Sequence, residues 1–220
     1  MTETARIMPF APPATHPQHE AAVPARSVCV FCGSGPGDNP AFVEAAHALG
    51  AALARERLGL VYGGGSLGLM GVVARASMDT GGYVIGVIPE FLRDREKPSR
   101  DLSELVVTKG MHERKQAMFD RASAFVALPG GLGTLDEIVE QMTWMQIGRH
   151  NKPILLLNVA GYWDPFLAMV ERMRASKFIR PGLDVAVGVA ETASEVVPMI
   201  RRLWRERSSE PVDGIAVQSL

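Results

Sequence analysis

The organisation of this chain is decided by the stretch Leu128-Pro129-Gly130-Gly131-Leu132-Gly133-Thr134-Leu135-Asp136-Glu137. It follows an apolar run, 124–128, that is typical of a buried strand, and it opens a helical pattern that continues to about residue 147. Glycines at such a turn allow the backbone to approach a ligand closely. The free N–H groups of a helix N-terminus carry partial positive charge. The stretch therefore predicts an anion site that suits a phosphate.

Glu137 lies one helical turn into this pattern, and two interpretations of it are open. In the first, its carboxylate faces the ligand and serves a part other than the phosphate, which it would repel. In the second, Thr134 and Glu137 form a capping box, in which the Glu side chain bonds back to the backbone N–H of the Thr. The loop is not a Walker A motif, because no Gly-Lys-Ser/Thr follows it.

Length and charge restrict the class of protein. The 220 residues suggest one domain, and 47% hydrophobic residues are enough for a sizeable core. A formal net charge of −1 lacks the basic excess of a nucleic-acid surface, so no nucleic-acid partner is expected. No apolar run approaches the roughly 20 residues of a membrane span, and the N-terminus lacks the apolar segment of a secretory signal. The sequence predicts a cytoplasmic protein without a membrane partner.

The two cysteines, Cys29 and Cys32, form a C-x-x-C pair that could indicate redox or metal chemistry. Both fall in the segment 27–32, which is predicted to be a strand, where residues three apart point to opposite faces. No second cysteine pair and no Asp/His cluster completes a metal site, so no metal and no other cofactor is predicted. The cysteines are interpreted as small buried hydrophobic residues.

Strand and helix patterns alternate along the chain. Residues 1–26 contain five prolines without periodicity and predict a disordered N-terminal arm, whereas the polar segment 206–220 predicts a flexible C-terminal tail. Between them, 27–205 is predicted to be one Rossmann-like nucleotide-binding catalytic domain. The predicted strands are 27–32, 59–62, 84–89, 105–108, 124–128, 153–157 and 185–190. The predicted helices are 40–57, 69–80, 111–122, the helix that ends near 147, 163–176 and 194–205, with a loop at 91–100.

This alternation predicts an α/β fold, a doubly wound parallel sheet with helices on both faces. Glycine-containing loops follow Cys32, Tyr62 and Leu128, and in a parallel sheet such loops meet at the carboxyl edge, where ligands bind. The sequence thus predicts a pocket for a nucleotide or sugar phosphate. The loop from Gly63 to Gly68 also matches the dinucleotide fingerprint, with Glu90 as its acidic residue, so an NAD-dependent oxidoreductase is an alternative. Against it, the fingerprint normally follows the first strand of the sheet, and here it follows the second.

A second motif lies at 111–115, where His112, Arg114 and Lys115 crowd the start of a predicted helix. The helix dipole disfavours cations at this end. Either the arrangement serves a function, or Glu113 compensates and the cations face solvent.

The motif Pro129-Gly-Gly-x-Gly-Thr-x-x-Glu137, together with Arg114-Lys115, resembles the Lonely Guy (LOG) family of phosphoribohydrolases. The resemblance extends over about 28–157 and includes the segments 32–34 and 63–71. It implies hydrolysis of the N-glycosidic bond of cytokinin riboside 5′-monophosphates and of AMP, with release of the base and ribose 5-phosphate. Some members have been labelled lysine decarboxylases, but this sequence indicates no decarboxylase machinery.

Carried over residue by residue, the resemblance implies Arg114 and Glu137 as the catalytic pair. The substrate-binding positions that it implies, together with those of the other glycine loops, are Glu96, Lys115, Gly130, Gly131, Leu132, Gly133, Thr134, Thr143, Gly33, Ser34, Gly64 and Gly65. Thr143 lies about 240° around the helix from Glu137, so it reaches the same pocket only through a partner subunit. Leu132 replaces a Tyr and Gly35 a Ser that are common in the family, which bears on base preference rather than reaction type.

The chemistry of the residues agrees with this resemblance. Cleavage of a ribosyl C–N bond builds positive charge on the sugar, which the carboxylate of Glu137 can stabilise while it orients ribose hydroxyls or activates water. Arg114 can hold the phosphate, orient Glu137 or assist the leaving base. The alternative class is a non-catalytic nucleotide or cofactor carrier on the same fold, which would not need the Arg114–Glu137 pair.

The helix that follows the glycine loop also predicts how the protein assembles. It has an apolar stripe at Leu135, Ile138, Met142 and Met145, whereas Trp144 and Ile147 lie off this stripe. One core cannot bury both faces, and exposed large apolar groups mark an interface. A homodimer built partly on this helix is predicted, as the family resemblance also implies.

Overall fold

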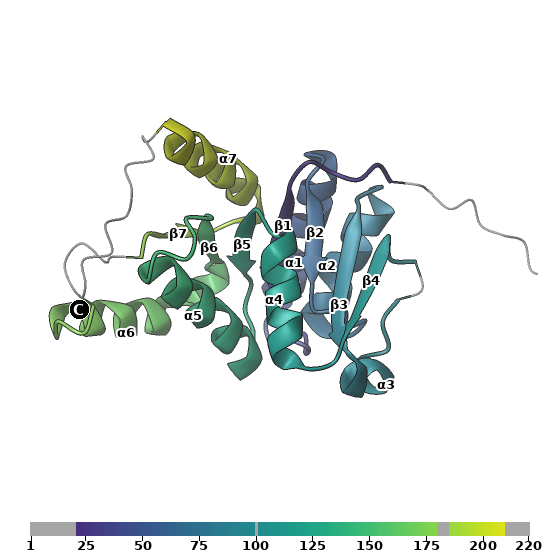
Figure 1. Ribbon diagram of the computed structural model, residues 1–220, viewed down its shortest axis with the longest axis horizontal. Coiled ribbons are helices and arrows are strands. Elements are labelled where there is room, and N and C mark those ends of the chain that lie inside the picture. Colours follow the sequence, from purple (N-terminus) through teal and green to yellow (C-terminus); the bar gives the residue numbers. More distant parts are fainter. Residues whose placement is uncertain (1–20, 100, 180–184, 210–220) are drawn as a thin grey trace, which may run out of the picture.

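The computed structural model describes residues 21–99, 101–179 and 185–209. They contain a seven-stranded sheet in the order β4-β3-β2-β1-β5-β6-β7, and each pair of neighbouring strands is parallel (Figure 1). The predicted doubly wound α/β fold is confirmed. The strands are β1 (Ser27–Phe31), β2 (Gly59–Tyr62), β3 (Val84–Pro89), β4 (Glu104–Thr108), β5 (Ala124–Ala127), β6 (Ile154–Leu157) and β7 (Val187–Ala190).

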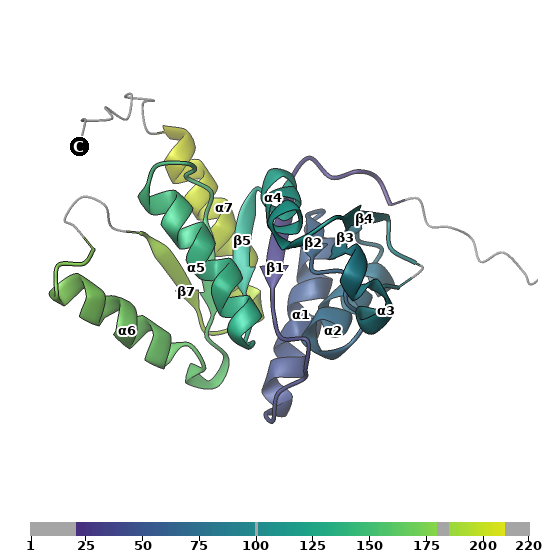
Figure 2. The same ribbon diagram turned by 60° about the horizontal axis from the view of Figure 1, so that its bottom comes forward.

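Helices cover both faces of this sheet, as Figures 1 and 2 show. The first face carries α1 (Pro40–Arg55), α2 (Gly68–Asp79) and α7 (Ala193–Ser209), whose apolar residues form one core cluster. The opposite face carries α4 (Met111–Arg121), α5 (Leu132–Gln146) and α6 (Asp164–Ala175), which pack into a second cluster. Short helical segments, η1 (Glu90–Leu92), α3 (Arg93–Glu96) and η2 (Val159–Gly161), follow β3 and β6.

The central strand β1 belongs to both cores because its residues alternate between the faces. Val28 and Val30 pack with α1 and α2, whereas Cys29 and Phe31 pack with α4 and α5. Cys29 and Cys32 lie in different clusters, and both are buried and free. Their interpretation as small core residues is therefore confirmed.

Three segments differ from the sequence prediction or extend beyond it. The stretch 91–100, predicted to be a loop, contains part of η1 and α3, while α7 continues to Ser209 instead of ending at 205. Of the predicted N-terminal arm, only 21–26 is described, and it contains no helix or strand. The rest of the arm and the tail beyond 209 lie outside the described residues. Within the described part of the chain, no helix is both long and apolar enough to cross a membrane.

The strand order positions the site. The chain runs from β1 outward to β4 and then returns to the other side of β1 with β5, so the winding reverses between β1 and β5. Loops that leave neighbouring strands at such a reversal diverge and open a crevice at the carboxyl edge. Here the two loops are joined at their base, because the N–H of Gly33 donates to the carbonyl of Pro129 at 3.0 Å.

Candidate active site

A cavity of about 300 Å³ opens at this reversal point. Its walls come from the end of β1, from the loops after β1, β2 and β5, from η1 and α3, and from the N-terminal parts of α2, α4 and α5. The structure brings together nine of the residues that the sequence assigned to the site, namely Gly33, Ser34, Glu96, Arg114, Gly131, Leu132, Gly133, Thr134 and Glu137.

The N-terminus of α5 borders this cavity. Gly131 is the N-cap residue, no side chain caps the helix, and its first turn contains no acidic residue. The first turn therefore has no acidic side chain that would offset the positive end of the helix dipole. A methyl group added at Gly131 or Gly133 would meet no atom of the described residues within 4 Å. The packing of the chain itself does not require glycine at these two positions, in contrast to the other glycines of the cavity.

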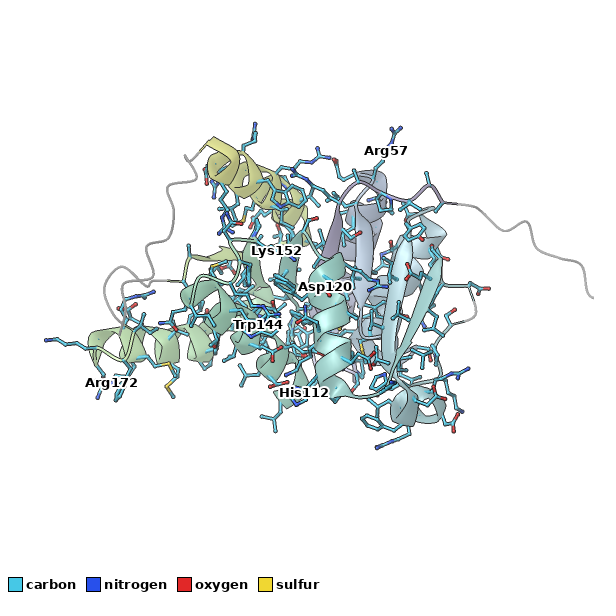
Figure 3. All side chains as sticks on the ribbon, in the orientation of Figure 1. Arg57, His112, Asp120, Trp144, Lys152 and Arg172 are labelled. Carbon is cyan, nitrogen blue, oxygen red and sulfur yellow. The ribbon has the colours of Figure 1, made fainter. Side chains whose placement is uncertain are left out.

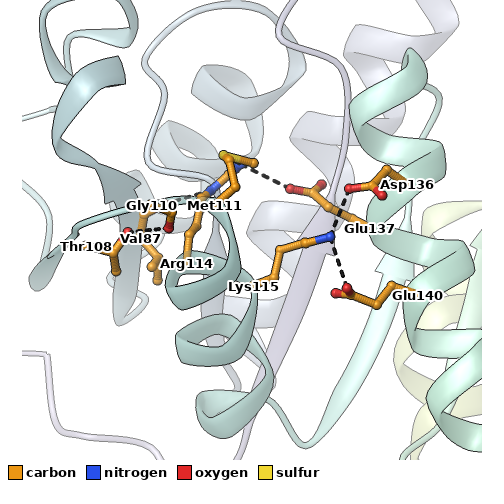
Figure 4. Close-up of polar contacts among 9 residues, drawn as sticks. All are labelled: Val87, Thr108, Gly110, Met111, Arg114, Lys115, Asp136, Glu137 and Glu140. Atoms are coloured by element: carbon orange, nitrogen blue, oxygen red, sulfur yellow. Dashed lines mark hydrogen bonds and ion pairs between the residues drawn. The ribbon is translucent and has the colours of Figure 1, made fainter.

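The carboxylate of Glu137 faces Arg114. Because α5 begins at Leu132, Thr134 lies inside the first turn rather than at the cap, so the capping-box interpretation is wrong. The Oε1 atom of Glu137 is 3.3 Å from Nη1 of Arg114 (Figure 4), and the two residues are 7% and 8% exposed. A charged pair this well buried must be held in position by its surroundings, since unpaired buried charges are costly.

Arg114 is held by backbone contacts. Its Nε donates to the carbonyl of Val87 within β3, 3.2 Å away, and a methyl group at Gly63 would overlap its guanidinium group. Of the three basic residues at the start of α4, only His112 is exposed (Figure 3). The interpretation that these cations face solvent is therefore wrong for Arg114, which is directed into the cavity.

Burial changes the proton affinity of the cavity side chains. It raises the pKa of the Glu137 carboxyl to about 7, against the opposing attraction of Arg114. A carboxyl with such a pKa exchanges protons readily near neutral pH, which is a property of acid–base groups in enzymes. Burial also raises the pKa of the Cys32 thiol far above its ordinary value, so this cavity residue stays protonated and is a poor nucleophile.

Lys115 is not brought to the cavity. Its Nζ lies 3.1 Å from Oδ2 of Asp136 and 3.0 Å from Oε1 of Glu140, two residues one turn apart on α5 (Figure 4). The side chain is 12% exposed and links α4 to α5. In this structure the residue that the family resemblance assigns to substrate binding instead fixes the distance between the two helices that carry Arg114 and Glu137.

Four other predicted positions lie outside the lining. Gly64, at φ 81°, packs against β3, and Gly65 leaves room for the Glu96 carboxylate. Gly130 lies under the Thr134 side chain, which leaves no space for a Cβ atom. Thr143 is exposed on α5, and its hydroxyl donates to the carbonyl of Val139 at 2.8 Å. Thus the three glycines do not line the cavity but allow the segments around it to pack closely. Thr143 does not reach the cavity of its own chain.

The cavity also has residues that the sequence analysis did not assign. Cys32, Gly63 and Met70 lie within the quoted motifs, so proximity to the assigned positions was a usable signal for them. Leu92 lies in the segment 91–100, which was predicted to be a loop near the site and contains the assigned Glu96, but no helical pattern indicated which of its side chains face the cavity. The complete set of unassigned lining residues is Val30, Phe31, Cys32, Gly63, Met70 and Leu92.

The geometry does not favour the NAD interpretation. Glu90, which would grip a ribose, is 3.2 Å from Arg93 in the next turn, is exposed and does not line the cavity. The fingerprint glycines Gly63 and Gly65 make room for the protein's own Arg114 and Glu96 side chains. They are therefore explained without a pyrophosphate.

The predicted apolar stripe of α5 faces the core. Ile138 and Met142 are buried, but Trp144 does not contribute to an exposed face, contrary to the sequence prediction. Its ring packs edge-on against Phe119 of α4 at 5.0 Å, and the Arg149 guanidinium lies over it at 3.8 Å. Figure 3 shows Trp144 on the side of α5 that faces α4. The apolar residues that remain exposed on this helix are Leu132, Val139 and Ile147.

Comparison with known proteins identifies related sequences. A family model described as "Possible lysine decarboxylase" matches residues 70–200. The chain is 46% identical to the cytokinin riboside 5′-monophosphate phosphoribohydrolase LOG of Oryza sativa subsp. japonica, over 78% of this chain and 71% of that protein. It is 52% identical to the probable phosphoribohydrolase LOGL9 of the same organism, over 71% and 69% of the two chains. LOG3 of Arabidopsis thaliana is 44% identical over 78% and 80%.

Solved structures share the fold. The structure titled TM1055 superposes with a TM-score of 0.62 at 25% identity and covers 80% of this chain and 99% of its own. A molybdenum cofactor carrier protein from Chlamydomonas reinhardtii gives a TM-score of 0.60 at 22% identity, over 82% and 99% of the two chains. At 22% identity, the similarity to the carrier protein shows only that the fold is shared.

Proposed function

Because the chain belongs to the LOG family of cytokinin riboside 5′-monophosphate phosphoribohydrolases, we propose that it hydrolyses the N-glycosidic bond of purine riboside 5′-monophosphates. The proposed substrates are cytokinin-type nucleotides, with an N6-substituted adenine, and AMP. The products are the free base and ribose 5-phosphate. One observation carries the proposal: Glu137 and Arg114 meet in a cavity beside the N-terminus of α5.

The phosphate is proposed to bind at the N-terminus of α5. The backbone N–H groups at Gly131, Leu132 and Gly133 belong to the first turn, where they have no partner within the helix. Glycine at 131 and 133 leaves space for a large anion to contact the backbone, which the internal packing does not use. Glu96 and Glu137 repel a phosphate and are hydrogen-bond acceptors, so they are assigned to the ribose side of the substrate.

The reaction is proposed to take place at C1′ of the ribose. The bond from C1′ to the base nitrogen breaks, and a bond from C1′ to the oxygen of water forms. As positive charge develops on the sugar, the ionised Glu137 stabilises it and accepts a proton from the attacking water. That proton ends on the departing base, so the protein returns to its initial state. A carboxyl whose pKa is about 7 is suited to take up and release a proton at neutral pH.

Arg114 is proposed to orient Glu137. Its Nε bond to Val87 fixes the guanidinium group, and the terminal nitrogen that faces Glu137 then defines where the carboxylate lies. The positive charge also keeps part of the Glu137 population ionised, because it lowers a pKa that burial alone would raise further. A carrier protein would gain nothing from this buried pair, which disfavours the carrier alternative.

Product analysis tests this function. The protein is incubated with AMP and, separately, with an N6-substituted AMP, and the mixtures are separated by chromatography. We expect free base and ribose 5-phosphate in equal amounts and with many turnovers. A nucleotide that is retained intact at one equivalent per chain would support the carrier alternative and refute the hydrolase.

We further propose that the protein acts as a homodimer through the exposed side of α5. Leu132 and Ile147 are 86% and 70% exposed on this helix, and Val139 lies between them. Leu132 also lines the cavity, so a partner that covers α5 would border the site. Thr143 lies in the same exposed row, and Thr143 of the partner subunit could then approach the cavity that its own chain does not reach.

Light scattering at micromolar concentration tests this assembly. The unaltered chain is expected to have the mass of a dimer, and Ile147→Asp to shift it to the mass of a monomer. Phe178→Asp is the matched control, because Phe178 is equally apolar and exposed but lies beyond α6. A monomeric unaltered chain, or dissociation by Phe178→Asp alone, would contradict the interface.

A further inference from the structure

Tyr162 connects the turn after β6 to the glycine loop. Its hydroxyl group donates a hydrogen bond to the carbonyl of Gly130, with 2.5 Å between the oxygens. Gly130 belongs to the loop between β5 and α5, whereas Tyr162 lies between η2 and α6. The bond therefore joins two loops at the carboxyl edge of the sheet, and Tyr162 itself does not line the cavity that contains Arg114.

Side-chain hydrogen bonds hold the turn that carries Tyr162 in place. Asn158 is buried, its Oδ1 accepts from the N–H of Trp163 at 2.7 Å, and its Nδ2 donates to Asp164 at 2.9 Å. Ala160 adopts the left-handed conformation, at φ 54° and ψ 31°. A residue with a side chain keeps this unfavourable conformation only where its surroundings impose it. The backbone is thus fixed at the position from which Tyr162 extends.

The ring of Tyr162 is also held on two sides. Phe42 of α1 packs edge-on against it at a centroid distance of 5.5 Å, and Trp163 does so at 5.2 Å. These two contacts restrict the position of the ring and therefore the position of its hydroxyl group. Figure 2 shows the segment between β6 and α6 next to the start of α1, in agreement with the contact to Phe42.

The Gly130–Gly131 peptide needs such a constraint. Glycine on both sides leaves this peptide plane more rotational freedom than any other pair of residues would. The peptide is trans, so its carbonyl and its N–H point in opposite directions. A hydrogen bond that holds the carbonyl of Gly130 toward Tyr162 therefore directs the N–H of Gly131 away from Tyr162. Gly131 is the N-cap of α5 and lines the cavity.

We propose that Tyr162 is a positioning residue that fixes the Gly130–Gly131 peptide plane and so holds the glycine loop in its phosphate-binding conformation. This inference rests on the proposed function, since it assigns the loop to the phosphate of the nucleotide. Tyr162 does not line the cavity, so it is assigned no contact with the reacting carbon or the base. Its loss should therefore weaken binding of the phosphate-bearing part of the substrate and leave binding of the base unchanged.

The test uses Tyr162→Phe, which removes only the hydroxyl group, and Tyr83→Phe as a matched control. Tyr83 is half-buried beside β3 and has no contact with the glycine loop. Inhibition of AMP hydrolysis is measured with ribose 5-phosphate and with adenine. Tyr162→Phe should weaken inhibition by ribose 5-phosphate about 3–10-fold, as expected for one neutral hydrogen bond. Inhibition by adenine should stay within twofold, roughly the error of such measurements.

Amide hydrogen exchange supplies a readout that does not depend on catalysis. Exchange of the segment 129–133 should be faster in Tyr162→Phe than in the unaltered protein, and unchanged in Tyr83→Phe. An unaltered protein that releases no base from AMP refutes the proposed function, and hydrogen exchange then decides the loop constraint by itself. If the unaltered protein is active, equal weakening of both inhibitors, or exchange in 129–133 that is the same in both variants, overturns the inference.

Discussion

Two neighbouring cations of α4 form ion pairs with α5: an inner pair made by Arg114, which lies in the cavity, and an outer pair of contacts made by Lys115, which does not. Arg114 and Lys115 are consecutive on α4, and their partners, Glu137 on one side and Asp136 with Glu140 on the other, are neighbours on α5. Arg114 is anchored to the backbone of β3 and faces the glycine loop. Lys115 lies one residue further around the helix, and it is directed away from the cavity.

Charge and sequence spacing therefore do not determine by themselves whether a side chain of α4 faces the cavity. A rotation of about 100° between consecutive helical residues separates a side chain that lines the cavity from a side chain that links the two helices. The inner pair has little water around it, which raises the proton affinity of Glu137. The outer pair has two carboxylates for one ammonium group and remains partly accessible.

The largest expected effect comes from the inner carboxylate. Glu137→Gln preserves size and helix propensity but removes the charge, so turnover of AMP should fall on the order of 10²–10⁴-fold with the fold intact. Glu140→Gln is the matched control on the outer pair, and it should retain activity within about threefold at pH 8.5, where its indirect influence on Glu137 is small. Steady-state release of adenine measures both. Full activity in Glu137→Gln would show that the inner carboxylate is not needed for the reaction.

The inner guanidinium should be almost as important. Arg114→Ala leaves Glu137 buried without its counter-charge, so turnover should fall by about 10²-fold or more, the usual effect of losing a positioned group. Circular dichroism and thermal melting show whether the variant folds. Arg114→Lys serves as a second variant, because it keeps the charge but not the planar geometry that bonds Val87 and faces Glu137 together. If Arg114→Lys is as active as the unaltered protein, orientation by the guanidinium is not required.

The pH dependence separates the two pairs further. Activity that needs the ionised Glu137 should decrease about tenfold per pH unit below the carboxyl pKa of about 7 and level off above it. Initial rates of AMP hydrolysis between pH 5 and 9 test this expectation. The residual activity of Glu137→Gln should not show this decrease on the acidic side of the pH profile. An activity that stays constant down to pH 5 would show that the protonation of Glu137 does not matter.

The same carboxyl should make the stability of the fold depend on pH in the opposite direction. Burial raises its pKa above the unfolded value of 4.5, so its contribution is fully present below pH 4.5 and is lost as pH rises through about 7. Between pH 4.5 and 8 the unaltered protein should lose on the order of 3 kcal/mol relative to Glu137→Gln, as linkage predicts for such a shift. Chemical denaturation of both proteins at several pH values measures this difference. A difference that is independent of pH would contradict the raised pKa.

The smallest effect is expected from Lys115. Lys115→Met removes the cation that partly screens Asp136 and Glu140 from Glu137, so the acidic limb of the pH profile should move to higher pH. At pH 8.5 the turnover should stay within about threefold, because the group lies outside the cavity. Lys109→Met, at an exposed position before α4, is the control and should not move the limb. A loss as large as that in Arg114→Ala would place Lys115 in the binding site after all.

Much of this arrangement could be predicted from local sequence patterns. The strands alternate with amphipathic helices, which define a parallel sheet, and its glycine loops define the carboxyl edge. Glu137 and Arg114 were predictable because they belong to a paired motif. The position of Leu92 was not, since a short helical segment in a polar stretch forms through its contacts with the glycine loop after β2, such as the bond from the N–H of Ser66 to the carbonyl of Glu96.

The directions in which side chains point also could not be predicted from the sequence. Trp144 was predicted to be exposed from its place on a helical wheel, but a wheel does not show that α4 lies close enough for Phe119 to cover it. The family resemblance assigned Arg114 to catalysis and Lys115 to substrate binding, but the sequence did not show that only Arg114, anchored by a carbonyl of β3, faces the cavity. Tyr162 is 32 residues away from Gly130, and no local pattern relates the two.

The glycine loop is proposed to anchor a phosphate so that the ribose lies over Glu137. This anchoring is tested most directly by the release of free adenine from AMP and from adenosine, measured by chromatography with the unaltered protein. Because remote binding energy positions the reacting carbon, AMP should be cleaved at least about 100-fold faster than adenosine. Equal rates for the two, or no adenine from AMP, would contradict the account.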